Sequence, residues 1–217
     1  MNLTLYYAPT ACAMVPYIAL TEAGADFKVH LVNLLKGDNT TPEFLRINPK
    51  KSVPVLMIDG SPLTENVAIQ IWIARNWPEA RLLPRGPLEE SRAIAFLAWC
   101  ASGIHPRLTP IFLPQRFCDM PGSEQGVRRC AEKLLLNNYA VAEDALADGR
   151  DWFFGDFTTA DAYFFWCFRR GIQFKVDVSR FARCYSHFER MKQRPSVEKL
   201  LAFEKSVIRV FTETCQK

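Results

Sequence analysis

One cysteine stands where a thiol would be activated for chemistry. Cys12 follows the expected first strand, residues 3–7, and a turn signal, and it begins the expected first helix, residues 12–23. The start of a helix carries partial positive charge, which stabilises a thiolate and lowers the pKa of a thiol. Four other cysteines fall on apolar faces of expected helices and are predicted to be core residues: Cys100, Cys130, Cys167 and Cys184. Cys12 is therefore the predicted reactive thiol.

Two further segments could bind a ligand through their backbone. Glu65 and Asn66 fall at the start of an expected helix, where unpaired N–H groups favour a carboxylate ligand, although the pair could simply complement the helix dipole. Pro54 lies within an apolar strand, where proline cannot donate to the ladder. A trans proline opening an edge strand accounts for it. A cis Val53–Pro54 bond would instead leave the N–H and C=O of Val53 pointing outward.

The elements that would position these residues alternate between strand and helix. A second strand, residues 27–32, is expected to run parallel to the first because a helix separates them. A short helix is expected from Thr41, with Pro42 at its first position. The apolar strand 53–58, the hairpin signal Asp59-Gly60, a strand at 61–63 and a helix from 64 or 65 to 75 complete the order βαβαββα.

The remainder of the chain gives only helical signals. A segment rich in proline and glycine follows residue 77, so we predict an α/β domain over 1–77, a linker over 78–88 and an all-helical domain over 89–217. Helices are expected over 89–105, along Val127, Cys130, Leu134, Val141 and Ala145, over 163–168 behind a capping box at 158–161, and over 181–191 up to Pro195.

Composition excludes several classes of function. The net charge of +4 comes from mixed basic and acidic residues without a basic stripe, which argues against a nucleic-acid partner. No signal peptide or membrane-spanning run of apolar residues is apparent. The seven cysteines form no CxxC pair and the three histidines are far apart, so we expect a reducing cytoplasm and no metal site.

The combination of these segments resembles a known family. The alternating order, the run from Asn48 through Val53-Pro54 to Leu56, the hairpin and the run Leu63-Thr64-Glu65-Asn66 are similar to the glutathione-binding domain of cytosolic glutathione transferases. The run Tyr6 to Cys12 looks like the pattern of the bacterial beta class. The resemblance covers essentially the whole chain and implies a thioredoxin-like domain followed by an all-helical one.

The resemblance implies a role for each matching position. Pro54 would be cis, and Val53 would pair with the cysteinyl part of glutathione through its backbone. The other expected glutathione contacts are Lys36, Lys51, Ser52, Glu65 and Asn66, although the family usually has Ser or Thr where Asn66 stands. Expected catalytic residues are Cys12, Tyr7 and His105, although Tyr7 could be a packing residue and His105, placed at a helix end, could be a dipole partner.

Three functions remain open on the sequence. The first is conjugation of the glutathione thiolate to a small hydrophobic electrophile, as in detoxification, by a homodimer whose helical domain lines the electrophile pocket. The second is glutathione-dependent reduction of disulfides or peroxides through Cys12. The third is a scaffold that retains the fold without catalysis.

Overall fold

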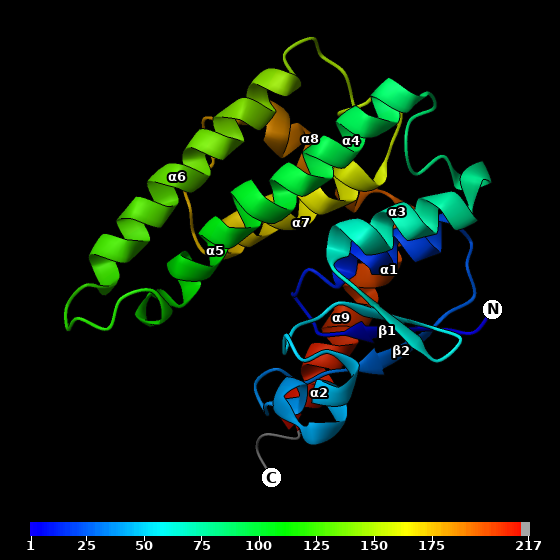
Figure 1. Cartoon of the computed structure of the whole chain (residues 1–217). Coiled ribbons are helices and arrows are strands. Elements are labelled where there is room, and N and C mark those ends of the chain that lie inside the picture. The colour runs from blue at the N-terminus through cyan, green and yellow to red at the C-terminus, as the bar shows by residue number, and fades with distance from the viewer. Residues whose placement is uncertain (214–217) are drawn as a thin grey trace. The chain divides into compact units, whose positions relative to one another are not determined.

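The computed structural model describes residues 1–213 as two compact units, one formed by residues 1–82 together with the segment from Gln193 onward, the other by residues 83–192 (Figure 1). The elements of the first unit are β1 (Leu3–Tyr7), α1 (Met14–Glu22), β2 (Lys28–Leu31), α2 (Pro42–Ile47), β3 (Val55–Ile58), β4 (Ser61–Thr64), α3 (Asn66–Asn76) and α9 (Pro195–Glu213). Those of the second are α4 (Pro87–Trp99), the π-helical turn η3 (Cys100–Ile104), α5 (His105–Phe112), α6 (Glu124–Ala145), α7 (Thr159–Gln173) and α8 (Ala182–Lys192).

The first unit is a thioredoxin-like sheet with helices. Its strands lie in the order β2-β1-β3-β4, with β1 parallel to β2 and antiparallel to β3, and β4 antiparallel to β3. Helix α1 packs on α3 and on α9, and Leu5, Ile18, Leu56 and Ile69 are fully buried in this core. The predicted strand, helix and hairpin order is therefore confirmed, including the parallel pair and the short helix capped by Thr41, whose hydroxyl accepts the Phe44 N–H.

The end of the first unit was not predicted. Helix α9 begins at Pro195, which was expected only to close the preceding helix. Glu22 of α1 accepts both Arg194 Nε, at 2.9 Å, and a bond from the Ser196 hydroxyl, so this segment is joined to α1. The compact units therefore divide differently from the predicted domains: the break after Leu82 falls within the predicted linker, but α9 clusters with the thioredoxin-like unit.

The second unit is all-helical, as expected, with two corrections of detail. The first predicted helix does not end at His105, because the chain continues through η3 into α5 and reaches Phe112. Helix α6 forms, but Cys130, Leu134 and Val141 are exposed, and the buried face is Ala131, Leu135, Tyr139 and Ala142. Both faces satisfy helical periodicity, and the one carrying the large Tyr139 ring, whose hydroxyl donates to the Cys167 carbonyl at 2.9 Å, is buried.

The capping box that begins α7 is present. The carboxylate of Asp161 accepts the Thr158 N–H at 2.8 Å, and the helix starts at Thr159. The same carboxylate lies 3.0 Å from Nε2 of the buried His187. This network fixes the start of the aromatic helix in the core of the second unit.

Candidate active site

Cys12 lies beside the proline that the sequence singled out. The Val53–Pro54 peptide bond is cis, as the resemblance implies. The Cys12 thiol is 8% exposed and donates to the Val53 carbonyl oxygen at 3.5 Å. Cys12 precedes the first residue of α1 by two positions, so its side chain lies near the positive end of that helix. The structure thus brings together the predicted reactive thiol and the predicted backbone binding segment.

The loop before Pro54 is held by an asparagine that sequence reasoning missed. Asn48 is 1% exposed; its amide donates to the Ser52 carbonyl at 2.7 Å, and its side-chain oxygen accepts the Lys50 N–H at 3.1 Å. Lys51 has a positive φ of 58°, and its carbonyl accepts the Asn39 amide at 2.7 Å. Lys51 and Ser52 are exposed. The sequence shows that Asn48 precedes a proline, but it does not show that Asn48 is buried. Its role in holding the loop depends on that burial, so it could not be predicted.

The start of α3 contacts the Cys12 segment through Asn66. The Asn66 amide is nearly buried and donates to the Cys12 carbonyl at 2.9 Å, while its oxygen accepts Nε2 of Gln70 at 3.1 Å. Both polar ends of this side chain therefore bond within the protein. The first backbone N–H groups of a helix lack partners within that helix, so those of α3 are further donors beside Asn66. Gln70 was not among the predicted site residues.

Glu65 precedes α3 with a positive φ of 72° and an exposed carboxylate. That carboxylate pairs with Nζ of Lys50 at 2.5 Å, and the same ammonium donates to the Thr64 hydroxyl at 2.8 Å. Lys50 lies in the loop that leads to Pro54, so the pair joins that loop to the start of α3. Lys36 is an exposed residue in the connection after β2.

Tyr7 lies deeper than a ligand-binding residue. Its side chain is fully buried, its hydroxyl donates to the Glu204 carboxylate at 3.4 Å, and its ring packs against Phe203. The same carboxylate accepts the Thr10 N–H at 2.7 Å. Glu204 belongs to α9 and is 2% exposed, so it supports the strand end and the turn that lead to Cys12. This geometry favours the packing role that the sequence left open for Tyr7.

His105 lies in the second unit, at the first position of α5. Its Nδ1 is 3.1 Å from the Tyr163 hydroxyl, and its ring meets Trp166 edge to face at a centroid distance of 4.3 Å. Desolvation by burial, together with the positive charge of Arg170, lowers the pKa of His105 to about 4. The imidazole is therefore neutral near pH 7. It does not sit at a helix C-terminus, so it is not a dipole partner.

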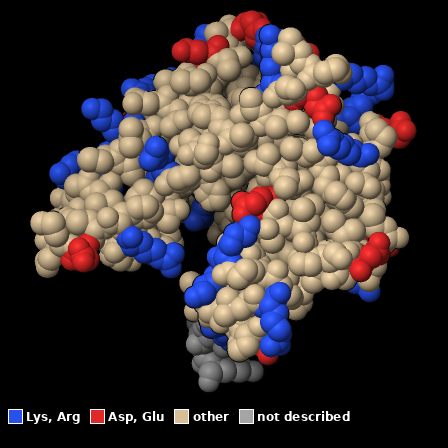
Figure 2. Space-filling model, viewed as in Figure 1, with Lys and Arg blue, Asp and Glu red and all other residues tan. Residues whose placement is uncertain are grey.

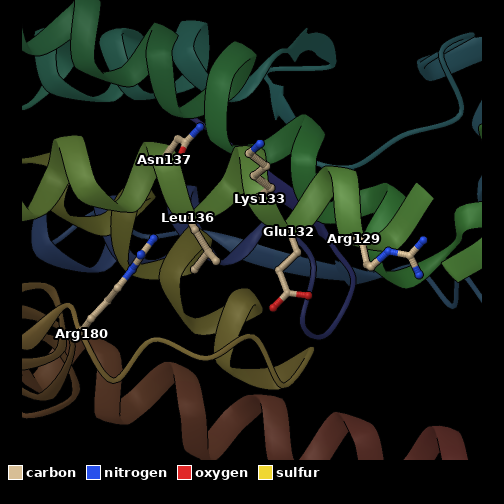
Figure 3. A pocket seen from close by; sticks show the side chains of 6 residues that line it. All are labelled: Arg129, Glu132, Lys133, Leu136, Asn137 and Arg180. Carbon is tan, nitrogen blue, oxygen red and sulfur yellow. The ribbon is translucent and has the colours of Figure 1, made fainter. Parts of the chain in front are cut away.

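One hollow in the second unit contains none of the predicted site residues. This hollow of about 450 Å³ on α6 is lined by Arg129, Glu132, Lys133, Leu136, Asn137 and Arg180, whose side chains point in several directions (Figure 3). Basic and acidic residues are interspersed on the face shown in Figure 2. Within residues 1–213, no three His, Cys, Asp or Glu side chains could hold a metal ion. None of the helices described there is both long and apolar enough to cross a membrane.

The sheet order, the cis proline and the thiol beside it define a thioredoxin-like unit joined to a helical one. The family model described as "Glutathione S-transferase, N-terminal domain" matches residues 1–75. The chain is 34% identical to the Escherichia coli O157:H7 protein "Glutathione S-transferase GstA", over 92% of this chain and 98% of that protein. On these grounds the chain belongs to the glutathione S-transferase family.

Solved structures agree with this assignment. A bacterial beta-class glutathione S-transferase from Sphingomonas chungbukensis has a TM-score of 0.82 at 33% identity, covering 93% of this chain and 98% of that one. A sphingomonad glutathione S-transferase complexed with glutathione also has a TM-score of 0.82, at 30% identity, with the same coverage. The expected family and fold class are therefore confirmed.

Proposed function

We propose that this chain is a glutathione transferase that joins the glutathione sulfur to a small hydrophobic electrophile. The observation that carries the proposal is the contact of the Cys12 thiol with the Val53 carbonyl oxygen at the cis proline. The relatives named as glutathione S-transferases, one of them solved with glutathione, support it. The co-substrate is glutathione, and no metal is required.

Glutathione would bind along the first unit in an extended form. The backbone of Val53 pairs with its cysteinyl residue, and the first N–H groups of α3 receive the α-carboxylate of its γ-glutamyl residue. The exposed Glu65 carboxylate receives the ammonium of that residue. Lys36, Lys51 and Ser52 provide donors for the glycyl end.

The chemistry needs the glutathione sulfur as a thiolate held at a fixed place. The N-terminal end of α1 favours negative charge near Cys12, so it favours a thiolate bound next to that residue. The sulfur then forms a bond to the electrophilic carbon, the leaving group departs with the electron pair of the broken bond, and the thiol proton passes to solvent. His105 remains a predicted catalytic residue; its imidazole is neutral near pH 7, so it can accept a hydrogen bond as well as donate one.

We also propose that the chain acts as a cytoplasmic homodimer. Helix α6 exposes Cys130, Leu134 and Val141 along one side, with 43% of Leu134 and 58% of Val141 accessible. Exposed apolar side chains on one helix face are typical of a surface that a second copy covers. Sedimentation of the purified chain, with Leu134→Lys as the disruptive variant, measures the oligomeric state.

Calorimetric titration with reduced glutathione tests the binding step. Wild type is expected to bind saturably at micromolar to millimolar strength, and Cys12→Ala to retain binding through Val53 and α3. Cys118→Ala, which removes a partly exposed free thiol of the second unit outside the proposed dimer surface, is the matched control and is expected to match wild type. Failure of wild type to bind glutathione at millimolar concentration would refute the proposal.

Conjugation of 1-chloro-2,4-dinitrobenzene, followed by absorbance, tests the reaction. Thiol–disulfide exchange is the second candidate function, and the position of Cys12 before α1 is the observation that favours it. Conjugation that persists in Cys12→Ser while disulfide reduction is lost would assign both activities. Reduction without conjugation of any electrophile would leave only the second candidate.

A further inference from the structure

Helix α9 places a buried carboxylate against the turn that follows β1. The Glu204 side chain is 2% exposed, and its oxygen Oε2 accepts both the Thr10 N–H at 2.7 Å and the Tyr7 hydroxyl at 3.4 Å. The neighbouring Phe203 stacks on the Tyr17 ring of α1 at a centroid distance of 5.5 Å. An apolar residue would pack among these rings, whereas burying a carboxylate costs free energy that hydrogen bonds must offset. The two hydrogen bonds therefore indicate what this carboxylate does.

Thr10 has a backbone conformation that a threonine rarely adopts. Its φ is 62°, in the left-handed region, where a side chain branched at Cβ is crowded. The turn around it contains a long bond from the Ala11 N–H to the Ala8 carbonyl, at 3.3 Å. A strained residue keeps its conformation only where the surrounding structure enforces it. The bond from the Thr10 N–H to Glu204 is one such constraint, and it comes from a residue 194 positions away in the sequence.

The conformation of Thr10 bears directly on the reactive thiol, which lies two residues later. The Cys12 carbonyl accepts the Asn66 amide at 2.9 Å, and the Cys12 thiol donates to the Val53 carbonyl at 3.5 Å. These contacts fix Cys12 on the side of α3 and of the loop that contains Val53. Glu204 fixes the chain that enters Cys12 from β1. A change of φ at Thr10 would turn the residues that follow it and move the thiol away from Val53.

Helix α9 is anchored firmly enough to impose this constraint. Just before the helix, Arg194 donates to both carboxylate oxygens of Glu22 in α1, through Nε at 2.9 Å and a terminal nitrogen at 2.7 Å. A pair joined by two parallel bonds has a well-defined geometry. The two side chains are 25% and 18% exposed, so salt screens them less than it screens a surface pair. The helix therefore presents Glu204 to the turn from a fixed position.

We propose that Glu204 is a positioning residue for Cys12. By holding Thr10 in the left-handed conformation, its carboxylate keeps the Cys12 thiol against the Val53 carbonyl. The hydrogen-bond acceptor is what this role needs, and the negative charge is not. The inference adds a residue of α9 to the glutathione site, and it rests on the proposed function in taking Cys12 as part of that site.

Two variants of Glu204 separate the acceptor from the charge. Glu204→Leu removes the acceptor, whereas Glu204→Gln removes the charge and keeps an oxygen that can accept both bonds. The measured quantities are the rate constant for alkylation of Cys12 by iodoacetamide, followed by mass spectrometry of the peptide that contains it, and the Kd of reduced glutathione from calorimetry. In Glu204→Leu the thiol leaves Val53 and becomes more exposed, so alkylation should be about tenfold faster and Kd about tenfold higher. Glu204→Gln should remain within about threefold of wild type in both.

Glycine at position 10 distinguishes positioning of the turn from general support by α9. Glycine adopts a positive φ without strain, so Thr10→Gly combined with Glu204→Leu should return both quantities to within about threefold of wild type. A loss of packing by α9 would not be rescued in this way. Glu198→Leu makes the same substitution at an exposed position of α9, so it is the matched control and should behave as wild type.

Thr10→Gly and Thr10→Ala, both with Glu204 intact, test the strained conformation even where Glu204→Leu fails to fold. The glycine variant should unfold at a higher urea concentration than the alanine variant, because only alanine has a Cβ to crowd at this φ. Equal unfolding midpoints for these two variants would overturn the inference.

The Glu204 variants give three further outcomes that would overturn it. These are alkylation that is unchanged or slower in a folded Glu204→Leu, a Glu204→Gln as impaired as Glu204→Leu, and a double variant that Thr10→Gly does not rescue. Failure of wild type to bind glutathione would instead overturn the proposed function, while the alkylation rates would still decide whether Glu204 positions Cys12.

Discussion

Replacing Asn66 by alanine tests whether its side chain joins α3 to the Cys12 segment. In the structure its amide donates to the Cys12 carbonyl at 2.9 Å and its oxygen accepts Nε2 of Gln70 at 3.1 Å. Gln70 is fully buried, and its Oε1 has no hydrogen-bond partner among the described residues. Asn66→Ala would therefore leave both polar atoms of a buried amide unpaired.

The size of the effect follows from which groups lose a partner. The Cys12 carbonyl still accepts the Val15 N–H at 3.1 Å, so it loses one of two bonds. The Gln70 donor loses the one partner described for it, and a buried unsatisfied donor costs about 1–3 kcal/mol. Adding about 1 kcal/mol for the lost bond to Cys12, we expect Asn66→Ala to lower the free energy of unfolding by about 2–4 kcal/mol. Loss of the link should also weaken glutathione binding about tenfold.

A double-mutant cycle with Gln70→Leu distinguishes this link from simple loss of packing. Gln70→Leu removes the amide whose oxygen is already unpaired, so alone it should destabilise by about 1 kcal/mol. In the double variant neither of these two buried amides remains. Its loss of unfolding free energy should therefore be smaller than the sum of the two single-variant losses by about 1 kcal/mol or more. Urea unfolding gives the free energies, and calorimetry gives the glutathione affinity.

Asn76→Ala is the matched control for this cycle. Asn76 ends the same helix and its amide donates to the Trp72 carbonyl at 2.8 Å, but the residue is exposed. Its loss should change the free energy of unfolding by about 0.5 kcal/mol or less. Strict additivity of Asn66→Ala and Gln70→Leu, or unchanged glutathione affinity in Asn66→Ala, would refute the reasoning.

Two other predictions concern the helical unit. A methyl group at Gly171 would overlap the Tyr139 hydroxyl, so Gly171→Ala should lower the free energy of unfolding, measured in urea, by about 1–3 kcal/mol. A methyl group at Gly126 would meet nothing within 4 Å, so Gly126→Ala is the control and should leave the free energy of unfolding unchanged or slightly higher. The pKa of His105 is about 4 in the folded chain and near 6.5 when unfolded, so the unfolded state binds more protons between these values. The free energy of unfolding should therefore fall as pH drops from about 6.5 to about 4, and a slope that His105→Gln leaves unchanged would contradict this.

The thioredoxin-like unit was predictable because its signals are local. Alternating apolar residues gave β1 within its observed bounds, Thr41 and Pro42 marked the start of α2, and Asp59-Gly60 marked the hairpin. Each of these signals acts through the backbone of a few neighbouring residues. The residues next to Val53–Pro54 did not by themselves indicate a cis peptide bond. The cis bond was expected only because the whole pattern resembled the glutathione transferase family.

What could not be predicted depends on contacts distant in the sequence. Helix α9 has ordinary helical periodicity, but its place in the first unit depends on Glu204 meeting Thr10, a pair separated by 194 positions. The buried face of α6 was wrongly assigned because Leu134 and Leu135 are equally apolar, and only the packing of Tyr139 against α7 decides between them. The internal bonding of Asn66 likewise requires Gln70 and the Cys12 carbonyl to be placed first.

The ion pair between Lys50 and Glu65 bears on whether Glu65 is available to glutathione. The two side chains are 48% and 69% exposed, and such exposed pairs contribute about 0–1 kcal/mol because water screens them. A ligand ammonium can therefore share or replace Lys50 at the carboxylate with little loss. Glu65 also adopts a positive φ of 72° immediately before α3, so the turn fixes its backbone at the start of that helix whichever cation its carboxylate meets. Because the ion pair is weak and the turn is independent of it, we expect Lys50→Ala to change glutathione affinity less than Glu65→Gln does.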